Sequence, residues 1–225
     1  MSARAEAWLG AREVAPLALG VAAYGLAFGL LAAQAGMSGL QVGVMGASVF
    51  AGASQIVAVE RLAAGAGAGA ALVAGLALNL RLVLVTASIR ALFEGRPLWQ
   101  RVLGAHMSTD ENWALTVAAR KAGRPVGWGY LVGSGLAILA AWLASTLTGA
   151  LVATSLPEPR ALGMDFAFTA AFVALARSLW RGRADALPWM ASAGVTAALA
   201  LSGVFDPSWA LVAGGVAGAA LAARG

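Results

Sequence analysis

Apolar runs separated by short polar joints dominate this chain. A helix needs about 20 predominantly apolar residues to cross the hydrocarbon core of a bilayer. Runs near that length cover residues 16–35, 42–59, 66–89, 102–119, 127–153, 161–176, 186–203 and 207–222. We therefore predict an all-α, polytopic membrane protein. We expect one transmembrane domain over residues 1–225, with about 7 spans and a range of about 6 to 8.

Composition supports this class, because 60% of the 225 residues are hydrophobic and only 11% are charged. Soluble domains are about 25% charged. The net charge is +5, but the basic residues stand in short joints, as in cytoplasmic loops, so we expect no nucleic-acid partner. There is no cysteine, and the single histidine, His106, cannot hold zinc alone, so we expect no metal and no cofactor. We expect the first apolar run to be retained as a span rather than removed as a signal peptide.

The fourth run carries signs of a break. Basic clusters flank it at residues 90–101 and 120–124, whereas a full span would put them on opposite sides of the membrane. Its centre, residues 106–112, is polar. We therefore predict a broken or re-entrant segment. From the basic cluster at 120–124, two further spans then bring residues 177–183 back to the cytoplasmic side. If the amino-terminal basic residues are also cytoplasmic, the Gly- and Ser-rich second run must be re-entrant as well.

A faint internal repeat is visible in the sequence. VFAGA at residues 49–53 echoes AFTAA at residues 167–171, each at the start of the second run of a four-run unit. Units over residues 14–121 and 127–222 would match the repeats of many transporters, in which broken helices meet at the substrate site. The alternative is a chance echo in a chain rich in alanine and glycine.

The second run contains the first candidate polar cluster. Ser48, Gly52 and Gln55 are spaced to share one face of a continuous helix, with Ser54 beside them. They could offer hydrogen-bonding groups and a close-approach glycine to a ligand. Helix packing through small residues is the alternative, but it does not explain Gln55.

Arg81 stands in an otherwise uncharged stretch, with Asn79 two residues before it. Arginine at bilayer depth costs roughly 2.5–3.5 kcal/mol, so it should face a partner or a wet cavity. The two side chains lie about 200° apart on a regular helix. Either the helix is interrupted, or they serve different partners. A functional role for Arg81 and a simple ion pair with a neighbouring helix both remain open.

The fourth run also predicts a helix start. Ser108 and Glu111 have the spacing of a capping box, which would place free amides and partial positive charge beside Asp110. Such an end suits a carboxylate ligand, and an ordinary interfacial cap is the alternative. Asp165 follows a proline-rich joint and is a further acidic candidate, for which an interfacial cap is again the alternative.

Four motifs in order are similar to those of the AzlC family, the large subunits of branched-chain amino acid exporters. They are SVFAGASQ at 48–55, NLR at 79–81, TDE at 109–111 and GMDFAF at 163–168. The resemblance covers roughly residues 14–183. It implies a permease of the bacterial inner membrane that exports valine, leucine, isoleucine and methionine, with a small AzlD-type subunit as partner. Many relatives continue after the arginine with histidine and then tyrosine, whereas Leu82 and further aliphatic residues follow Arg81 here.

By position, the resemblance makes Gln55, Asn79, Arg81, Asp110 and Glu111 candidates for the transport path. Our hypothesis is alternating access, in which Arg81 or the helix start holds the substrate carboxylate and an acid holds its ammonium group. Protonation of Asp110, Glu111 or Asp165 is the predicted energy coupling. The alternatives are a non-transporting assembly subunit and, less favoured by the lack of HExxH, GxSxG or cysteine, an intramembrane enzyme.

Overall fold

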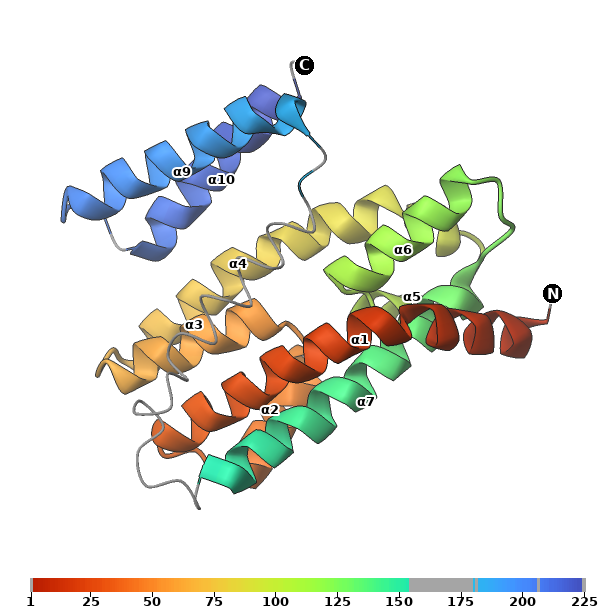
Figure 1. Ribbon diagram of the computed structural model, residues 1–225, viewed down its shortest axis with the longest axis horizontal. Coiled ribbons are helices and arrows are strands. Elements are labelled where there is room, and N and C mark those ends of the chain that lie inside the picture. Colours follow the sequence, from red (N-terminus) through yellow and green to blue (C-terminus); the bar gives the residue numbers. More distant parts are fainter. Residues whose placement is uncertain (1, 154–179, 181, 206, 224–225) are drawn as a thin grey trace.

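A computed structural model describes residues 2–153, 180, 182–205 and 207–223, which form helices and no strands (Figure 1). The sixth predicted run and Asp165 lie outside the described residues. The helices are α1 (Ala3–Gln34), α2 (Gly39–Val49), α3 (Gly52–Ala63), α4 (Ala68–Ser88), η1 (Arg90–Leu92), α5 (Leu98–His106), α6 (Asp110–Lys121), α7 (Trp128–Ala153), η3 (Arg183–Asp185), α9 (Ala186–Leu201) and α10 (Pro207–Ala222). The all-α prediction is confirmed.

Four of the described helices, α1, α4, α7 and the stretch from η3 through α9, are long and apolar enough to cross a membrane. Helix α2 and residues 209–222 are shorter apolar helices. On α4, Leu72, Leu76, Leu80 and Leu84 recur every four residues and are all more than half exposed. A long apolar helix whose leucine face is not covered by protein suits a lipid environment. The chain is therefore an integral membrane protein of the helical class.

The fourth run is broken, as predicted, and the second run, for which a break was one of two open alternatives, is broken as well. The second run forms α2 and α3, which separate at residues 50–51, and the fourth region forms α5 and α6, which separate at residues 107–109. The chain therefore alternates long helices with pairs of short ones. Because each pair returns toward its starting side, α1 and α7 run in the same direction.

Helices α1 and α7 form the tightest contact of the bundle. A Cβ at Gly10 would meet the backbone of Tyr130, and one at Gly149 would meet the backbone of Leu26, near the other end of the interface. Glycine lets two backbones approach this closely, which is how membrane helices commonly associate without a hydrophobic driving force. The parallel α1–α7 pair is thus the rigid centre on which the short helices are placed.

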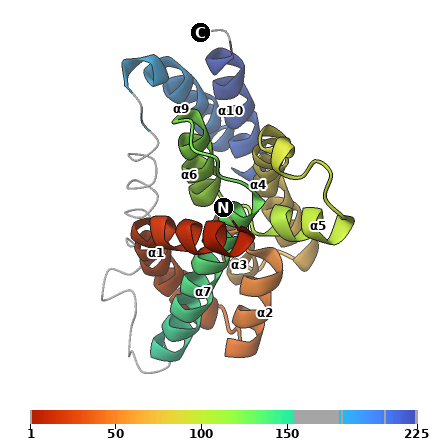
Figure 2. The ribbon, with the colours of Figure 1, turned by 90° about the vertical axis from the view of Figure 1, so that its right-hand side faces the viewer.

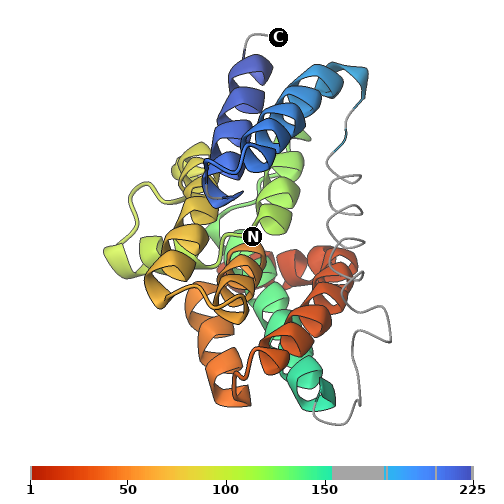
Figure 3. The ribbon, with the colours of Figure 1, turned by 90° about the vertical axis from the view of Figure 1, so that its left-hand side faces the viewer.

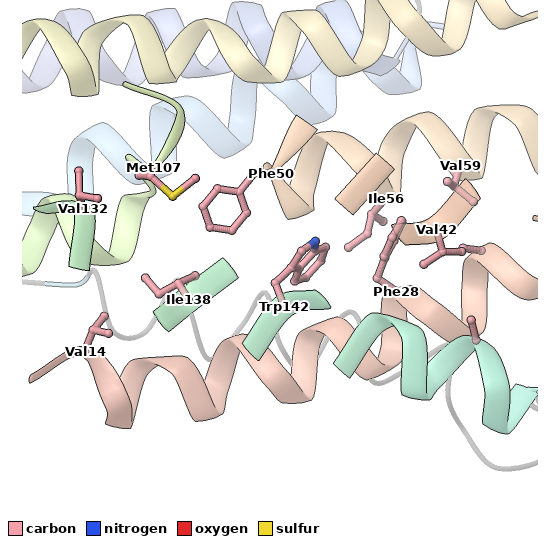
Figure 4. Close-up of a cluster of buried hydrophobic side chains, with 12 residues drawn as sticks. Val14, Phe28, Val42, Phe50, Ile56, Val59, Met107, Val132, Ile138 and Trp142 are labelled. Atoms are coloured by element: carbon pink, nitrogen blue, oxygen red, sulfur yellow. The ribbon is translucent and has the colours of Figure 1, made fainter. Parts of the chain in front are cut away.

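A buried apolar cluster fills the space between this pair and the broken helices (Figure 4). Trp142 of α7 stacks on Phe28 of α1, with 5.4 Å between ring centroids and an interplanar angle of 19°. Phe50, at the α2–α3 junction, lies between Met107 and Trp142 in Figure 4. The two helix breaks therefore pack against the same core.

The basic joints at residues 90–101 and 120–124 lie at one end of the bundle. Trp128, the first residue of α7, donates its Nε1–H to the carbonyl of Gln100 in α5 over 3.0 Å, and the Arg96 guanidinium lies 5.1 Å from the Trp128 ring centroid. At the same end, Arg124 makes two hydrogen bonds to the Glu13 carboxylate, at 2.6 and 3.0 Å. These contacts bring the clusters on both sides of the fourth region together, as its predicted break requires.

Helices α9 and α10 form a hairpin that stands apart from α1, α2 and α7 and rests against α4 (Figures 1 and 3). Gly214 and Gly218 of α10 both lie directly against Ser192 of α9. Small residues therefore again set the distance between two packed helices. The predicted repeat units 14–121 and 127–222 remain a prediction, because residues 154–179 fall outside the described part of the chain.

Candidate functional site

A cavity of about 380 Å³ opens where the two helix breaks meet the bundle centre. Its walls are parts of α1 between residues 16 and 24, the α2–α3 junction, Arg81 and Leu82 of α4, the start of α6, and Ile138 and Trp142 of α7. This volume is in the range of small-molecule sites. Of the predicted site residues, Gly52, Arg81, Asp110 and Glu111 line the cavity.

The α2–α3 junction turns the backbone sharply at the cavity wall. Phe50 adopts a left-handed conformation, with φ 44° and ψ 44°, and Ala51 is extended, with φ −143° and ψ 86°. Helix α3 then begins at Gly52 without a side-chain cap. The first amides of a helix have no intrahelical acceptor and carry partial positive charge. This junction therefore presents uncapped backbone N–H groups close to the cavity.

The prediction that Ser48, Gly52 and Gln55 share one helical face is wrong, because the helix breaks between Ser48 and Gly52. Ser48 belongs to α2, is exposed, and donates its hydroxyl to the carbonyl of Val44 over 2.7 Å. Gly52 lines the cavity instead, with its missing Cβ facing the rings of Tyr24 and Trp142. A side chain at position 52 would collide with both rings.

Helix α6 begins one residue later than predicted, so the capping box of Ser108 and Glu111 is wrong. Thr109 is the cap, and its hydroxyl accepts from the amide of Asn112 over 3.4 Å, while the Asn112 side chain accepts from the Thr109 amide over 2.8 Å. Ser108 instead donates to the carbonyl of Gly104. Glu111 is therefore not used in capping and lines the cavity.

Asn112 is a structural residue that our sequence reasoning missed. It is fully buried, and its amide also donates to the carbonyls of Met107 and Leu131, which ties the break to α7. Its position three residues after Thr109 could have revealed the cap, because asparagine can close the same reciprocal pair as glutamine.

Arg81 and Asp110 form an ion pair at the cavity wall, with 3.0 Å between Nη1 and Oδ2. Their side chains are 43% and 27% exposed. The pair joins the middle of α4 to the first turn of α6. It meets the expectation that an arginine at bilayer depth faces a partner and a cavity rather than lipid. Glu111 has no ion-pair partner within the described part of the chain.

Asn79 and Arg81 serve different partners on an unbroken helix, which was one of the two alternatives from the sequence. Helix α4 runs continuously through both residues. The Ser54 hydroxyl donates to Asn79 Oδ1 over 2.6 Å, linking α3 to α4, while Arg81 points to α6. Ser54 and Asn79 thus position the α3 start relative to α4.

Gln55 is fully buried, and neither atom of its side-chain amide has a hydrogen-bond partner among the described residues. It lies three residues after Gly52 and so shares the α3 face that meets the Tyr24 and Trp142 rings. A buried amide without a partner costs roughly 1–3 kcal/mol. Tyr24 and Trp142 are cavity residues that the sequence did not single out.

His106 lies outside the cavity lining and places Nε2 2.9 Å from the carbonyl oxygen of Ala47, so it holds α5 against α2. Across the residues described, no three histidine or acidic side chains gather as a metal site would require.

Comparison with known families decides the assignment. A model of the AzlC protein family matches residues 16–156, more than half of the chain. The chain belongs to the AzlC family. No curated protein and no solved structure matches it.

The matched residues contain both helix breaks and every cavity-lining residue. Asp165 and the α9–α10 hairpin lie beyond the match. Membership in the AzlC family makes this a membrane protein of the transport class, associated with branched-chain amino acid transport rather than with catalysis.

Proposed function

We propose that this AzlC chain is the large subunit of an exporter for branched-chain amino acids in the bacterial inner membrane. The observation that carries the proposal is the cavity itself, where an uncapped helix start, a partly exposed Arg81–Asp110 pair and the Glu111 carboxylate meet apolar walls. Discontinuous helices that end at one midplane cavity are typical of transporter substrate sites.

The polar groups match the two ends of a zwitterionic amino acid. The first amides of α3, near Gly52, suit the substrate carboxylate, because they are uncapped donors at a positive helix end. Glu111 suits the ammonium group, because it faces the cavity and is not engaged in an ion pair in the described structure. Arg81 is the second candidate for the carboxylate, at the expense of its bond to Asp110.

The apolar walls would select the side chain. Leu17 and Val21 of α1, Leu82 of α4 and Ile138 of α7 also line the cavity. One methylene in such a pocket is worth only about 1–3 kcal/mol of discrimination. We therefore expect valine, leucine and isoleucine to share the site, with methionine as a further substrate.

Alternating access, a small AzlD-type subunit and proton coupling complete the proposal. Asp110 and Glu111, which line the cavity, are candidate proton carriers, and Asp165, outside the described residues, is a third candidate. Asp110→Asn and Glu111→Gln should then reduce efflux and flatten its dependence on pH. Unchanged transport and pH dependence in both variants would end the coupling hypothesis.

The first test is valine efflux from peptide-loaded bacteria that lack their own branched-chain exporters. Cells would express the AzlD-type subunit with the wild type, with Arg81→Ala, or with Arg12→Ala as a matched control outside the cavity, at equal membrane abundance. We expect efflux from the wild type and the control and at least a 10-fold loss in Arg81→Ala. Absence of efflux from a well-folded wild-type complex, across the branched-chain residues and methionine, would refute the proposal.

The alternative function is a non-transporting assembly subunit, in which Arg81 serves only as an ion pair. Because its partner Asp110 lies in the same chain, the exchange Arg81→Asp with Asp110→Arg separates the two readings. A purely structural pair tolerates the exchange. A transport site does not tolerate it, because the positive and negative charges that contact the substrate change places. We therefore expect the double variant to assemble normally and to lose efflux.

A further inference from the structure

A second hollow, the α4–α5 groove, lies at the basic end of the bundle. It has a volume of about 680 Å³ and is formed by the last turns of α4, η1 and α5. Apolar side chains, among them Val83 and Val102, line it together with Arg90, Glu94 and Arg101. None of these residues belongs to the transport cavity.

The arginines in and near the α4–α5 groove differ in whether they bond to other protein groups. Arg96 is committed to the protein, since it donates to the carbonyl of Leu92 over 2.9 Å and to Gln100 over 3.1 Å. Arg90 and Arg101 are exposed and have no hydrogen bond or ion pair within the described structure. With Glu94 counted, the groove still carries a net positive charge. Two unpaired guanidinium groups facing one groove suit an anion.

The surroundings of the groove are apolar and exposed. Helix α5 projects sideways from the bundle (Figure 2) and exposes Leu98, Trp99 and Val102 at 73%, 62% and 59%. A short amphipathic helix with an exposed tryptophan next to basic residues is typical of the membrane–water interface. These surroundings therefore favour an anion that has an apolar tail over a small, fully hydrated anion.

We propose that the α4–α5 groove binds an anionic phospholipid, with Arg90 and Arg101 donating to the oxygens of its phosphodiester. The acyl chains would run along Val83 and the exposed leucines of α4 toward the membrane interior. Glu94 would accept hydrogen bonds from headgroup hydroxyls, such as those of phosphatidylglycerol. A choline headgroup offers no such donor and adds a cation beside the two arginines. The inference rests on membrane embedding and on this groove, not on the identity of the transported amino acid.

Native mass spectrometry of the full-length protein in maltoside micelles tests this site. The probes are dioleoylphosphatidylglycerol, dioleoylphosphatidylcholine and inorganic phosphate. The groove variant Arg90→Gln/Arg101→Gln is compared with Arg12→Gln/Lys121→Gln, which removes the same charge from exposed positions outside the groove. Equal elution volumes and equal melting temperatures without added lipid would establish that both variants are folded.

We expect phosphatidylglycerol to bind the wild type and the control with similar affinity and the groove variant roughly 10- to 30-fold more weakly, because each interfacial arginine contributes separately to anionic lipid binding. Phosphatidylcholine, which has the phosphodiester but also a cation, should bind the wild type more weakly and lose less affinity in the groove variant than phosphatidylglycerol does. Equal affinities of the groove and control variants would overturn the proposal. Competition by inorganic phosphate at the same concentration as the lipid would overturn it too, because the site would then recognise phosphate alone.

Discussion

At the residue scale, Arg81 is tolerated because the fold surrounds it with compensating contacts. An unpaired guanidinium at bilayer depth costs roughly 2.5–3.5 kcal/mol. Here Asp110 neutralises it, and the Arg81 side chain, which is 43% exposed, lines the cavity. Because both partners face the cavity, a bound substrate can compete for either charge. Under the proposed function, the same geometry that stabilises the arginine leaves it available to the substrate.

The Ser54–Asn79 hydrogen bond predicts a measurable stability effect. Ser54→Ala removes the donor and leaves the Asn79 carbonyl without this partner, so we expect a loss of about 1 kcal/mol, in the range for hydrogen bonds between membrane helices. Titration with SDS in mixed micelles would measure the free energy of unfolding. Ser48→Ala is the control, since Ser48 bonds only within its own helix and is exposed, and its effect should stay within about 0.5 kcal/mol. Equal losses in the two variants would contradict the proposed α3–α4 link.

At the element scale, the two helix breaks have different physical causes. The α5–α6 break is held by a capping box between Thr109 and Asn112, which satisfies backbone donors at the α6 start. The α2–α3 break has no such cap and depends on the left-handed Phe50, whose ring is buried in the core. A non-glycine residue in this conformation persists only where its surroundings hold it. The uncapped break therefore leaves more of its backbone donors for a ligand than the capped one does.

Helix packing predicts a severe effect at Gly133 of α7. A Cβ there would overlap the backbone of Ala7, which cannot move aside as a flexible side chain could. We expect Gly133→Ala to cost about 3 kcal/mol or more, at or above the top of the usual range for overpacking. The matched change Gly194→Ala, in open space on α9, should be neutral or stabilising by up to about 1 kcal/mol.

SDS unfolding and the yield of monodisperse protein would measure both effects. A tolerated Gly133→Ala, with Gly194→Ala equally tolerated, would show that α1 and α7 do not pack as closely as described.

At the scale of the whole molecule, the broken pairs decide membrane topology. Because α2–α3 and α5–α6 each return toward their starting side, the starts of α1 and α7 and the end of α4 share one face of the bundle. Glu13, Arg124, Arg96 and Trp128 make the contacts that join these ends. The Glu13 carboxylate also raises the pKa of Arg124 through their hydrogen bonds. The positive-inside rule then predicts that this face is cytoplasmic.

Because the chain has no cysteine, single cysteines can test this topology directly. Ala91→Cys and Lys121→Cys lie at the basic end, whereas Gln34→Cys lies at the opposite end of α1. We expect a membrane-impermeant maleimide to label only Gln34→Cys in intact spheroplasts and all three variants after permeabilisation. Labelling of Ala91→Cys and Lys121→Cys from opposite sides would mean that the fourth region spans the membrane.

Some of these features follow from the sequence by itself. Apolar runs fix the membrane class, because backbone groups in lipid must be satisfied inside helices or closed barrels. Basic clusters on both sides of the polar centre at 106–112 fixed the break of the fourth region. The angular separation of Asn79 and Arg81 predicted that they cannot meet one ligand on a continuous helix, since side-chain direction there depends on helix geometry. The continuity of α4 then decided that they serve different partners.

Tertiary structure decided at which residue each run breaks and what meets at the breaks. Ser48 and Gln55 look equivalent under helical periodicity, but the buried Phe50 ring turns the backbone between them, and only core packing selects that conformation. The choice of Thr109 over Ser108 as cap depends on Asn112 being held against α7. The partnership of Arg81 with Asp110 joins residues from separate helices. Contacts between distant elements are set by how apolar surfaces and glycine faces fit together, and local patterns do not encode that fit.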